Sequence, residues 1–300
     1  MMPYDEYGAR LTPEADANAH LRDWLRALST DLVAESPNEL DIDALAKRVE
    51  QAKDEADRDF KTAYLRVPAT VNGQDVVQLF DDGAFGKSHQ LTIIGDEVFV
   101  KLLPSACVVV WPSLLYRLLK RIEAAAGRSE VELDPENSTL MHSRHLGVDI
   151  AREPSGALTP SPLASHVNYC PSVLVEIGTS EFPEDVPGEK DWWVDFSEQS
   201  THGKLGLIIL ITLSKCSKSL CITLCPASSF TAHRTLTLPF DGALPDTGRL
   251  EFEVEWLYGG ERPEWCEGEG EGEGERVVLR KEDLEVFRGA VGRRVFPRRC

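Results

Sequence analysis

Long hydrophobic runs are missing from this 300-residue sequence. The longest, LGLIILITL at 205–213, has nine residues, whereas a helix needs about 20 apolar residues to span a bilayer. The first residues, MMPYDEYGAR, are polar and acidic, unlike a secretory signal. We therefore expect an intracellular protein, cytoplasmic or nuclear, that has no membrane partner.

Basic residues are scarce as well. The chain has 32 Lys and Arg against 50 Asp and Glu, a formal net charge of −18. Phosphate contacts need Lys and Arg, so this balance excludes a general polyanion binder. Part of the acidic excess comes from the low-complexity run EGEGEGEGE at 267–275, for which we expect a solvated loop. A nucleic-acid partner would need a local basic face or a compensating cation.

The seven cysteines have no compact framework spacing. Cys216, Cys221 and Cys225 lie close together but lack a nearby fourth ligand, which is a poor pattern for zinc. We expect free buried thiols in a reducing compartment. His142 and His145 also lack an identifiable third ligand, and we interpret them as polar surface residues rather than metal ligands.

The first 65 residues are expected to form an N-terminal helical region. Hydrophobic residues recur at helical spacing over 12–34 and again from 39 or 41 to 64, and SPN at 36–38 supplies the break between the two helices.

Short β-rich segments begin after residue 65. A core is expected over 66–235, and it contains a helix at 112–126 closed by Gly127. A β-rich C-terminal extension is expected over 236–300, ending in a short helix at 281–288. The strands predicted outside the central motif lie at 67–71, 76–80, 91–94, 97–103, 220–224, 235–239, 250–257 and 277–279.

The central motif combines two apolar runs and an amphipathic segment. The run Ser172–Ile177 carries Glu176 in its interior, the paired Trp192 and Trp193 follow, and the second run is Leu205–Leu213. This order predicts a strand, a helix and a parallel strand. Isolated ionised carboxylates are costly to bury, so Glu176 is expected to be paired, protonated or bound to metal.

The order of helix, β-hairpin, strand with a buried acid, helix and strand resembles the PD-(D/E)XK, or restriction-endonuclease-like, superfamily. The residues PSVLVEIGTSE at 171–181 carry the resemblance. More closely, the segment is similar to a group of uncharacterised fungal proteins with an EIGxSE…WW signature, and the match covers residues 110–230. The resemblance implies an α/β fold, a restriction-endonuclease-like mixed sheet flanked by helices.

The same resemblance implies a metal site, in which an Asp and a Glu on adjacent strands hold a divalent cation. Glu176 resembles the acid of the second strand, and Asp149 is the best match for the preceding Asp, with Asp134 and Glu153 as alternatives. Glu123 matches the superfamily's accessory acid on the helix. Hard oxygen ligands suit Mg²⁺ or Mn²⁺, which polarises the phosphate and acidifies water.

One position departs from the superfamily pattern. Two residues after Glu176 the pattern has a Lys that positions the attacking water, and this chain has Gly178. Some members place that Lys on the following helix. Lys190, ahead of the paired tryptophans, and Lys204, ahead of the next strand, are the candidates here.

Two functions stay open on these observations. The first is a metal-dependent nuclease that hydrolyses phosphodiester bonds in DNA or RNA. The second is a catalytically inactive nuclease-fold protein that acts as an interaction module for a protein partner. The net charge and Gly178 favour the second, whereas Glu176, Asp149 and a displaced Lys favour the first. No feature fixes the oligomeric state.

Each motif also has a simpler interpretation. Glu176 could be a structural carboxylate that accepts hydrogen bonds from the Ser172 or Ser180 hydroxyl or from backbone amides. Trp192 and Trp193 are interpreted as packing residues rather than a base-stacking pair. The sequence GTSEF around Ser180 does not match the GxSxG nucleophile elbow, which argues against a serine hydrolase.

Overall fold

The structure is a computed structural model, which describes the chain in segments. The predicted strand at 76–80, the Glu/Gly run at 267–275 and most of the helix predicted at 12–34 lie outside them. The described residues are 23, 25–26, 29–31, 42–67, 88–127, 132–136, 141–145, 148–161, 169–179, 193–194, 196–198, 200, 202–227, 232–244, 248–260, 263 and 276–296.

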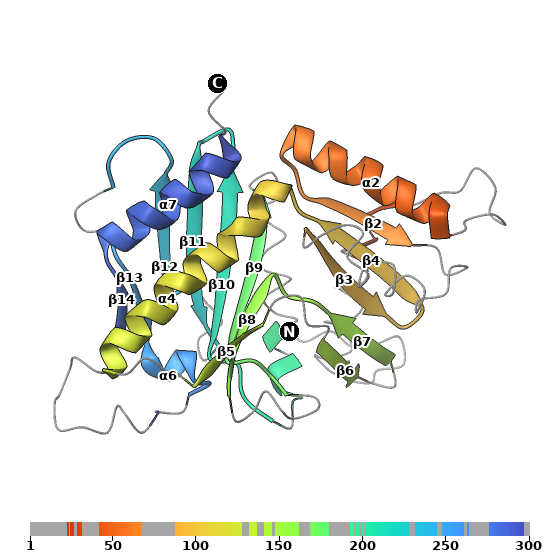
Figure 1. Ribbon diagram of the computed structural model, residues 1–300. Coiled ribbons are helices and arrows are strands. Elements are labelled where there is room, and N and C mark those ends of the chain that lie inside the picture. Colours follow the sequence, from red (N-terminus) through yellow and green to blue (C-terminus); the bar gives the residue numbers. More distant parts are fainter. Residues whose placement is uncertain are drawn as a thin grey trace, which may run out of the picture.

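Two six-stranded sheets form the framework (Figure 1). The first sheet has the order β1 (Thr30–Asp31), β2 (Ala63–Val67), β4 (Glu97–Leu102), β3 (His89–Ile94), β7 (Val148–Arg152) and β6 (Met141–His145). The second has the order β12 (Arg234–Pro239), β11 (Ser219–Pro226), β10 (Leu207–Ser214), β9 (Val173–Thr179), β8 (Gly156–Pro160) and β5 (Leu133–Glu136). The strands β13 (Leu250–Glu253) and β14 (Arg276–Leu279) form a separate two-stranded antiparallel sheet.

The parallel pairing of β9 and β10 confirms the predicted strand–helix–strand unit. Leu207 pairs with Val173 and Leu210 with Glu176, and residues 193–194 and 196–198 between the two strands are helical. On its other side β9 pairs antiparallel with β8, which pairs antiparallel with β5. The second sheet is therefore mixed.

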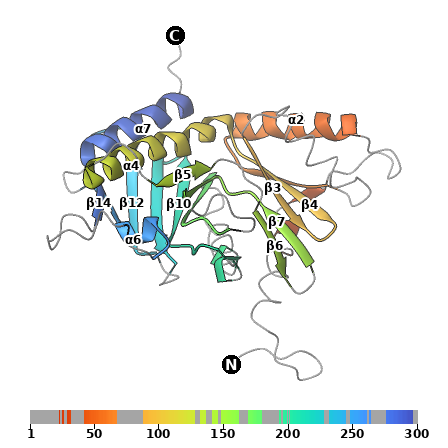
Figure 2. The same cartoon turned by 60° about the horizontal axis from the view of Figure 1, so that its bottom comes forward.

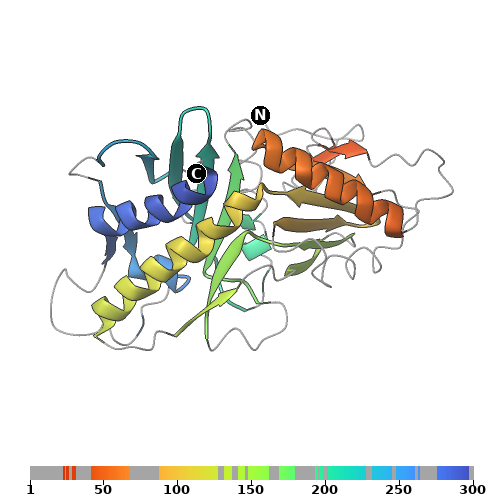
Figure 3. The ribbon, with the colours of Figure 1, turned by 45° about the horizontal axis from the view of Figure 1, so that its top comes forward.

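Among the described elements, three long helices lie on the same side of the sheets (Figures 2 and 3). They are α2 (Ile42–Asp59), next to the first sheet, and α4 (Val110–Ala126) and α7 (Lys281–Val295), next to the second. The 3₁₀ helix η1 (Ser105–Val109) leads into α4, and the short helix α6 (Val254–Leu257) follows β13. None of the helices in the described segments is long and apolar enough to cross a membrane.

Several predicted boundaries hold and others shift. The helix closed by Gly127 is confirmed as α4, and Gly127 takes the left-handed conformation at φ 64°. The predicted end of the second helix at residue 64 is wrong. Helix α2 ends at Asp59, because Phe60 takes a φ of 53°, and β2 begins at Ala63. The strand predicted at 250–257 divides into β13 and α6, and the last helix runs to Val295. Residues 30–31, predicted as helix, form β1.

Three hydrophobic clusters fill the spaces between these layers. One joins α2 to the first sheet, and a second joins α4 and α7 to the second sheet. The third contains residues of both sheets, such as Phe99 and Leu174, together with Trp193 of the helical segment. Strand alternation assigns β9 residues to two faces. We call the face of Val173, Val175 and Ile177 the helix-side face, and the face of Leu174 and Glu176 the inter-sheet face.

Candidate functional site

Glu176 is the buried acid at the centre of the molecule. Its strand β9 runs between β8 and β10, so it has no exposed edge. Glu176 lies on the inter-sheet face and is 3% exposed. An ionised carboxylate in such a place requires partners, because desolvation penalises the charge.

The Oε1 atom of Glu176 accepts two hydrogen bonds from aromatic and cationic groups. Trp193 Nε1 donates at 2.7 Å and Arg152 Nη2 at 3.4 Å. The Arg152 guanidinium also lies 5.3 Å from the centre of the Trp193 ring, a cation–π distance. Both side chains are buried, and together they fix the orientation of the carboxylate.

The Oε2 atom contacts three donors from the other side. Ser155 Oγ lies 3.3 Å away and Gln90 Nε2 3.5 Å away, and Lys101 Nζ forms an ion pair at 3.6 Å. Lys101 comes from β4 and is 7% exposed. Gln90 comes from β3, so the carboxylate on the second sheet is held by two strands of the first sheet.

A second buried acid lies at the point where the chain leaves the first sheet. Glu153 follows β7 and is 4% exposed. Its Oε2 accepts the backbone N–H of Leu91 at 2.9 Å, and its own N–H donates to the Leu91 carbonyl at 3.0 Å. Glu153 is thus tied to β3 by its backbone and side chain, which accounts for its burial without a metal ion.

Asp149, Asp134 and Glu123 do not lie on the strands next to β9. Asp149 lies on β7 of the first sheet, opposite Arg144 of β6, whereas the strands next to β9 are β8 and β10. Asp134 is exposed on β5, one strand beyond β8. Glu123 lies on α4, which packs on the helix-side face of β9, so the sheet separates Glu123 from Glu176. The expected pairing of acids on adjacent strands is therefore not what the fold provides.

Of the two candidates for the displaced lysine, Lys204 lies in the described residues. Lys204 is exposed and precedes β10 at Leu207, while Leu210 is the residue that pairs with Glu176. The intervening extended chain is about 20 Å long. Lys190 lies outside the described residues. Among the described lysines, Lys101 is the one that reaches the acid, and no local pattern around Glu176 indicates it.

The simpler interpretations of the motif fare differently. Glu176 accepts hydrogen bonds as a structural carboxylate does, but the Ser172 hydroxyl contacts the Leu158 and Leu257 carbonyls instead. Trp193 is buried and is a packing residue, as predicted. Ser180 and Trp192 lie outside the described residues, and so do the side chains of His142 and His145.

Metal-ligating side chains form no cluster in the described segments. Among the described residues, no group of three or more His, Cys, Asp or Glu side chains could hold a metal ion. The five cysteines in those segments are free, as predicted, and Cys107, Cys170 and Cys225 are buried, whereas Cys216 is exposed. Burial raises the pKa of the Cys107 and Cys170 thiols to about 12, so both stay protonated near neutral pH.

The hydroxyl of Tyr169, which is paired with Glu136 of β5, also has a shifted pKa. The Tyr169 hydroxyl donates a hydrogen bond to the Glu136 carboxylate. Burial, followed by this hydrogen bond, raises the pKa of the Tyr169 hydroxyl well above its usual range. Tyr169 therefore stays protonated and serves as a hydrogen-bond donor.

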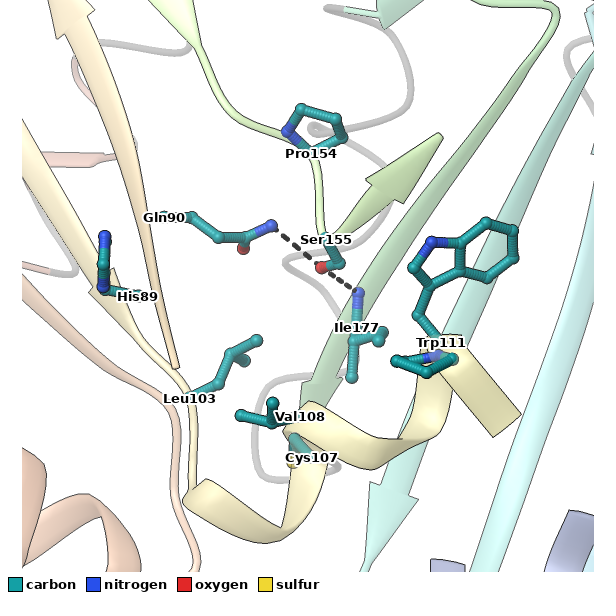
Figure 4. Close-up of a pocket in the computed structure, with 10 residues that line it drawn as sticks. His89, Gln90, Leu103, Cys107, Val108, Trp111, Pro154, Ser155 and Ile177 are labelled. Carbon is teal, nitrogen blue, oxygen red and sulfur yellow. Dashed lines mark hydrogen bonds between the residues drawn. The ribbon is translucent and has the colours of Figure 1, made fainter. Parts of the chain in front are cut away.

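A small pocket opens beside the Glu176 contacts (Figure 4). Its volume is about 80 Å³. Gln90 and Ser155, which both contact Glu176, belong to its lining, together with residues of η1 and α4. The pocket thus adjoins two of the residues that contact the acid.

Comparison with known proteins adds no assignment. No protein-family model matches the chain, and no curated protein matches it.

Proposed function

We propose that this chain is a restriction-endonuclease-like protein without hydrolytic activity, in which Glu176 joins the two sheets and the fold serves as an interaction module for a protein partner. The fold part of the proposal is supported by the element order. Helix α4 precedes the antiparallel strands β5, β8 and β9 of the second sheet, with β6 and β7 of the first sheet inserted between β5 and β8, and a helical segment then leads to the parallel strand β10. This is the order that the sequence resemblance implies.

The observation that carries the loss of activity is the set of donors around Glu176. A metal-bound carboxylate directs its lone pairs at the cation, but both oxygens here already accept hydrogen bonds or ion pairs. Lys101 and Arg152 place two positive charges within 3.6 Å of the carboxylate. Like charges at such distances in a buried site strongly oppose a third cation.

The position that would supply the second acid supports the same conclusion. Antiparallel pairing joins Gly156 of β8 to Val175 of β9, so the next pair along the ladder is Ser155 and Glu176. The residue beside Glu176 is therefore a serine. Its hydroxyl is a weak metal ligand compared with a carboxylate, and it is already bonded to Glu176.

A protein partner fits the charge of the chain better than nucleic acid does. At −18 the protein repels polyanions over the range of the Debye length. The two buried cations near Glu176 are enclosed and paired, so they supply no surface for phosphate contacts.

One observation favours the alternative, a metal-dependent nuclease. Lys101 lies as close to Glu176 as a water-positioning lysine would, at 3.6 Å. In that reading Lys101 replaces the lysine missing at Gly178, and metal binding requires Arg152 to leave the carboxylate.

The deciding experiment is a cleavage assay with Mg²⁺ and with Mn²⁺ on labelled single- and double-stranded DNA and RNA. We compare the wild type with Glu176→Gln, and use Glu55→Gln, an exposed position on α2, as the matched control. We expect the same background level of cleavage in all three proteins. Calorimetry should show no Mn²⁺ binding that depends on Glu176. Metal-dependent cleavage that survives in Glu55→Gln and disappears in Glu176→Gln would overturn it and establish the nuclease.

A further inference from the structure

The pocket beside the Glu176 contacts has a built polar wall. Gln90 Nε2 donates to Ser155 Oγ at 2.9 Å, and Ser155 Oγ accepts the backbone N–H of Ile177 at the same distance (Figure 4). Both side chains also contact Glu176 Oε2. These bonds hold the wall in one geometry before any ligand arrives, which reduces the entropic cost of binding.

A buried donor in the pocket lining lacks a partner. Trp111 lines the pocket and is 1% exposed, and its Nε1–H has no hydrogen-bond partner among the described residues. Indole is a donor only, so this group needs an acceptor. Leaving such a group unsatisfied is energetically costly, and a ligand acceptor would recover part of that cost.

The indole cannot easily turn away to find another partner. A Cβ atom built on Gly156 would lie 2.1 Å from Trp111 Nε1, so the β8 backbone packs directly against the ring. Trp111 also belongs to the cluster beneath α4. The ring is therefore held in place in the pocket lining, where Figure 4 draws Trp111 beside Ile177.

The other lining residues limit the size and polarity of a ligand. Leu103, Val108 and Pro154 supply apolar surface. Cys107 also lines the pocket, and its thiol is protonated near neutral pH. A volume of about 80 Å³ has room for roughly five waters, or a group of about four to six non-hydrogen atoms.

We infer that this pocket binds a small carbonyl-bearing group, an amide or a carboxylate, whose oxygen accepts the Trp111 indole N–H. The group is either a small molecule or the end of a larger one. A cation is disfavoured, because the nearest acid, Glu176, is already bonded to Lys101 and Arg152. This inference goes beyond the proposed function and holds whether or not the chain cleaves nucleic acid.

The test follows the indole N–H of Trp111 directly. The full chain is labelled with ¹⁵N and contains six tryptophans, and the Trp111 signal is the one that Trp111→Phe removes. Acetamide and sodium acetate are titrated as probes, and trimethylammonium chloride serves as the probe of similar size without an acceptor. We expect a saturable downfield shift of the Trp111 indole proton with acetamide or acetate, and none with trimethylammonium. The resonance of Trp256, outside the pocket, should stay in place.

Two variants distinguish binding in the pocket from a general effect. Val108→Phe fills the pocket and should weaken the probe at least tenfold. Trp111→Phe keeps an aromatic ring but loses the donor, and should weaken the probe about tenfold in ligand-observed spectra. Circular dichroism checks that each variant is folded.

Three outcomes would overturn the inference. They are a shift that rises linearly and is shared by Trp256, an equal response to trimethylammonium, or unchanged affinity in a folded Val108→Phe protein. Separate arms with acetamide and with acetate show whether the neutral or the charged carbonyl group is preferred.

Discussion

The two faces of β9 show two ways in which one strand is held in a core. The helix-side face presents Val173, Val175 and Ile177 to α4 and α7, and each contributes apolar burial that is nearly independent of its neighbours. The inter-sheet face presents Glu176, whose carboxylate connects side chains from both sheets. The stabilisation from apolar burial falls in small steps as single groups are removed. A buried charged cluster instead loses much of its stabilisation when any one member is removed.

The largest expected effect comes from removing the acid itself. Glu176→Ala leaves the Lys101 and Arg152 cations buried without their carboxylate, and should lower the free energy of unfolding by about 3–5 kcal/mol. Chemical denaturation measures the loss. Glu55→Ala, at an exposed site on α2, should stay within about 0.5 kcal/mol of the wild type. A loss below about 1 kcal/mol for Glu176→Ala would mean that the cluster is not the connection described here.

Two glycines sharpen the contrast between the faces. Gly156 pairs with Val175, and a Cβ there would meet the Trp111 ring at 2.1 Å, so Gly156→Ala should destabilise by about 1–3 kcal/mol through overpacking. Gly178 lies two residues after Glu176, and a Cβ there meets no atom within 4 Å. Gly178→Ala should therefore be neutral, or stabilising by up to about 1 kcal/mol. The same denaturation assay compares them, and equal losses would contradict the geometry.

A conservative truncation measures the tolerance of the helix-side core. Ile209, which pairs with Val175 across β9 and β10, is buried in the cluster beneath α4 and α7. Ile209→Val removes one methylene group and should cost about 1 kcal/mol. A loss as large as that of Glu176→Ala would show that this face is no more tolerant than the other.

Near neutral pH the smallest effect comes from Cys107, whose contribution changes only in alkaline solution. Burial raises the pKa of this thiol from 9.0 to about 12, so the folded chain keeps a proton that the unfolded chain releases. The resulting stabilisation is complete below about pH 9 and is lost as the pH rises toward 12. The free energy of unfolding of Cys107→Ala should thus fall less steeply over this range than that of the wild type. Parallel curves would contradict the assignment.

Local sequence patterns were sufficient to predict β9, its parallel partner β10, helix α4 and the burial of Trp193. They could not supply the partners of Glu176. Lys101 and Gln90 belong to strands of the other sheet, whereas Arg152 ends β7 and Ser155 lies in the segment that connects the sheets. Their approach depends on how two sheets pack, which no spacing near Glu176 encodes. Lys204 was a candidate because it precedes the strand that follows the motif. The register of β9 and β10 pairs Glu176 with Leu210, which is six residues beyond Lys204.

The crossing from β7 to β8 has a mechanical consequence. In the three residues between these strands, Glu153 is bonded to β3 and Ser155 to Glu176 of β9. A rotation of one sheet against the other would have to break these bonds and expose buried charges. The connection therefore holds the two sheets in a fixed relative orientation and does not act as a hinge. Both halves of the molecule should consequently lose their hydrogen-exchange protection together, in a single cooperative opening.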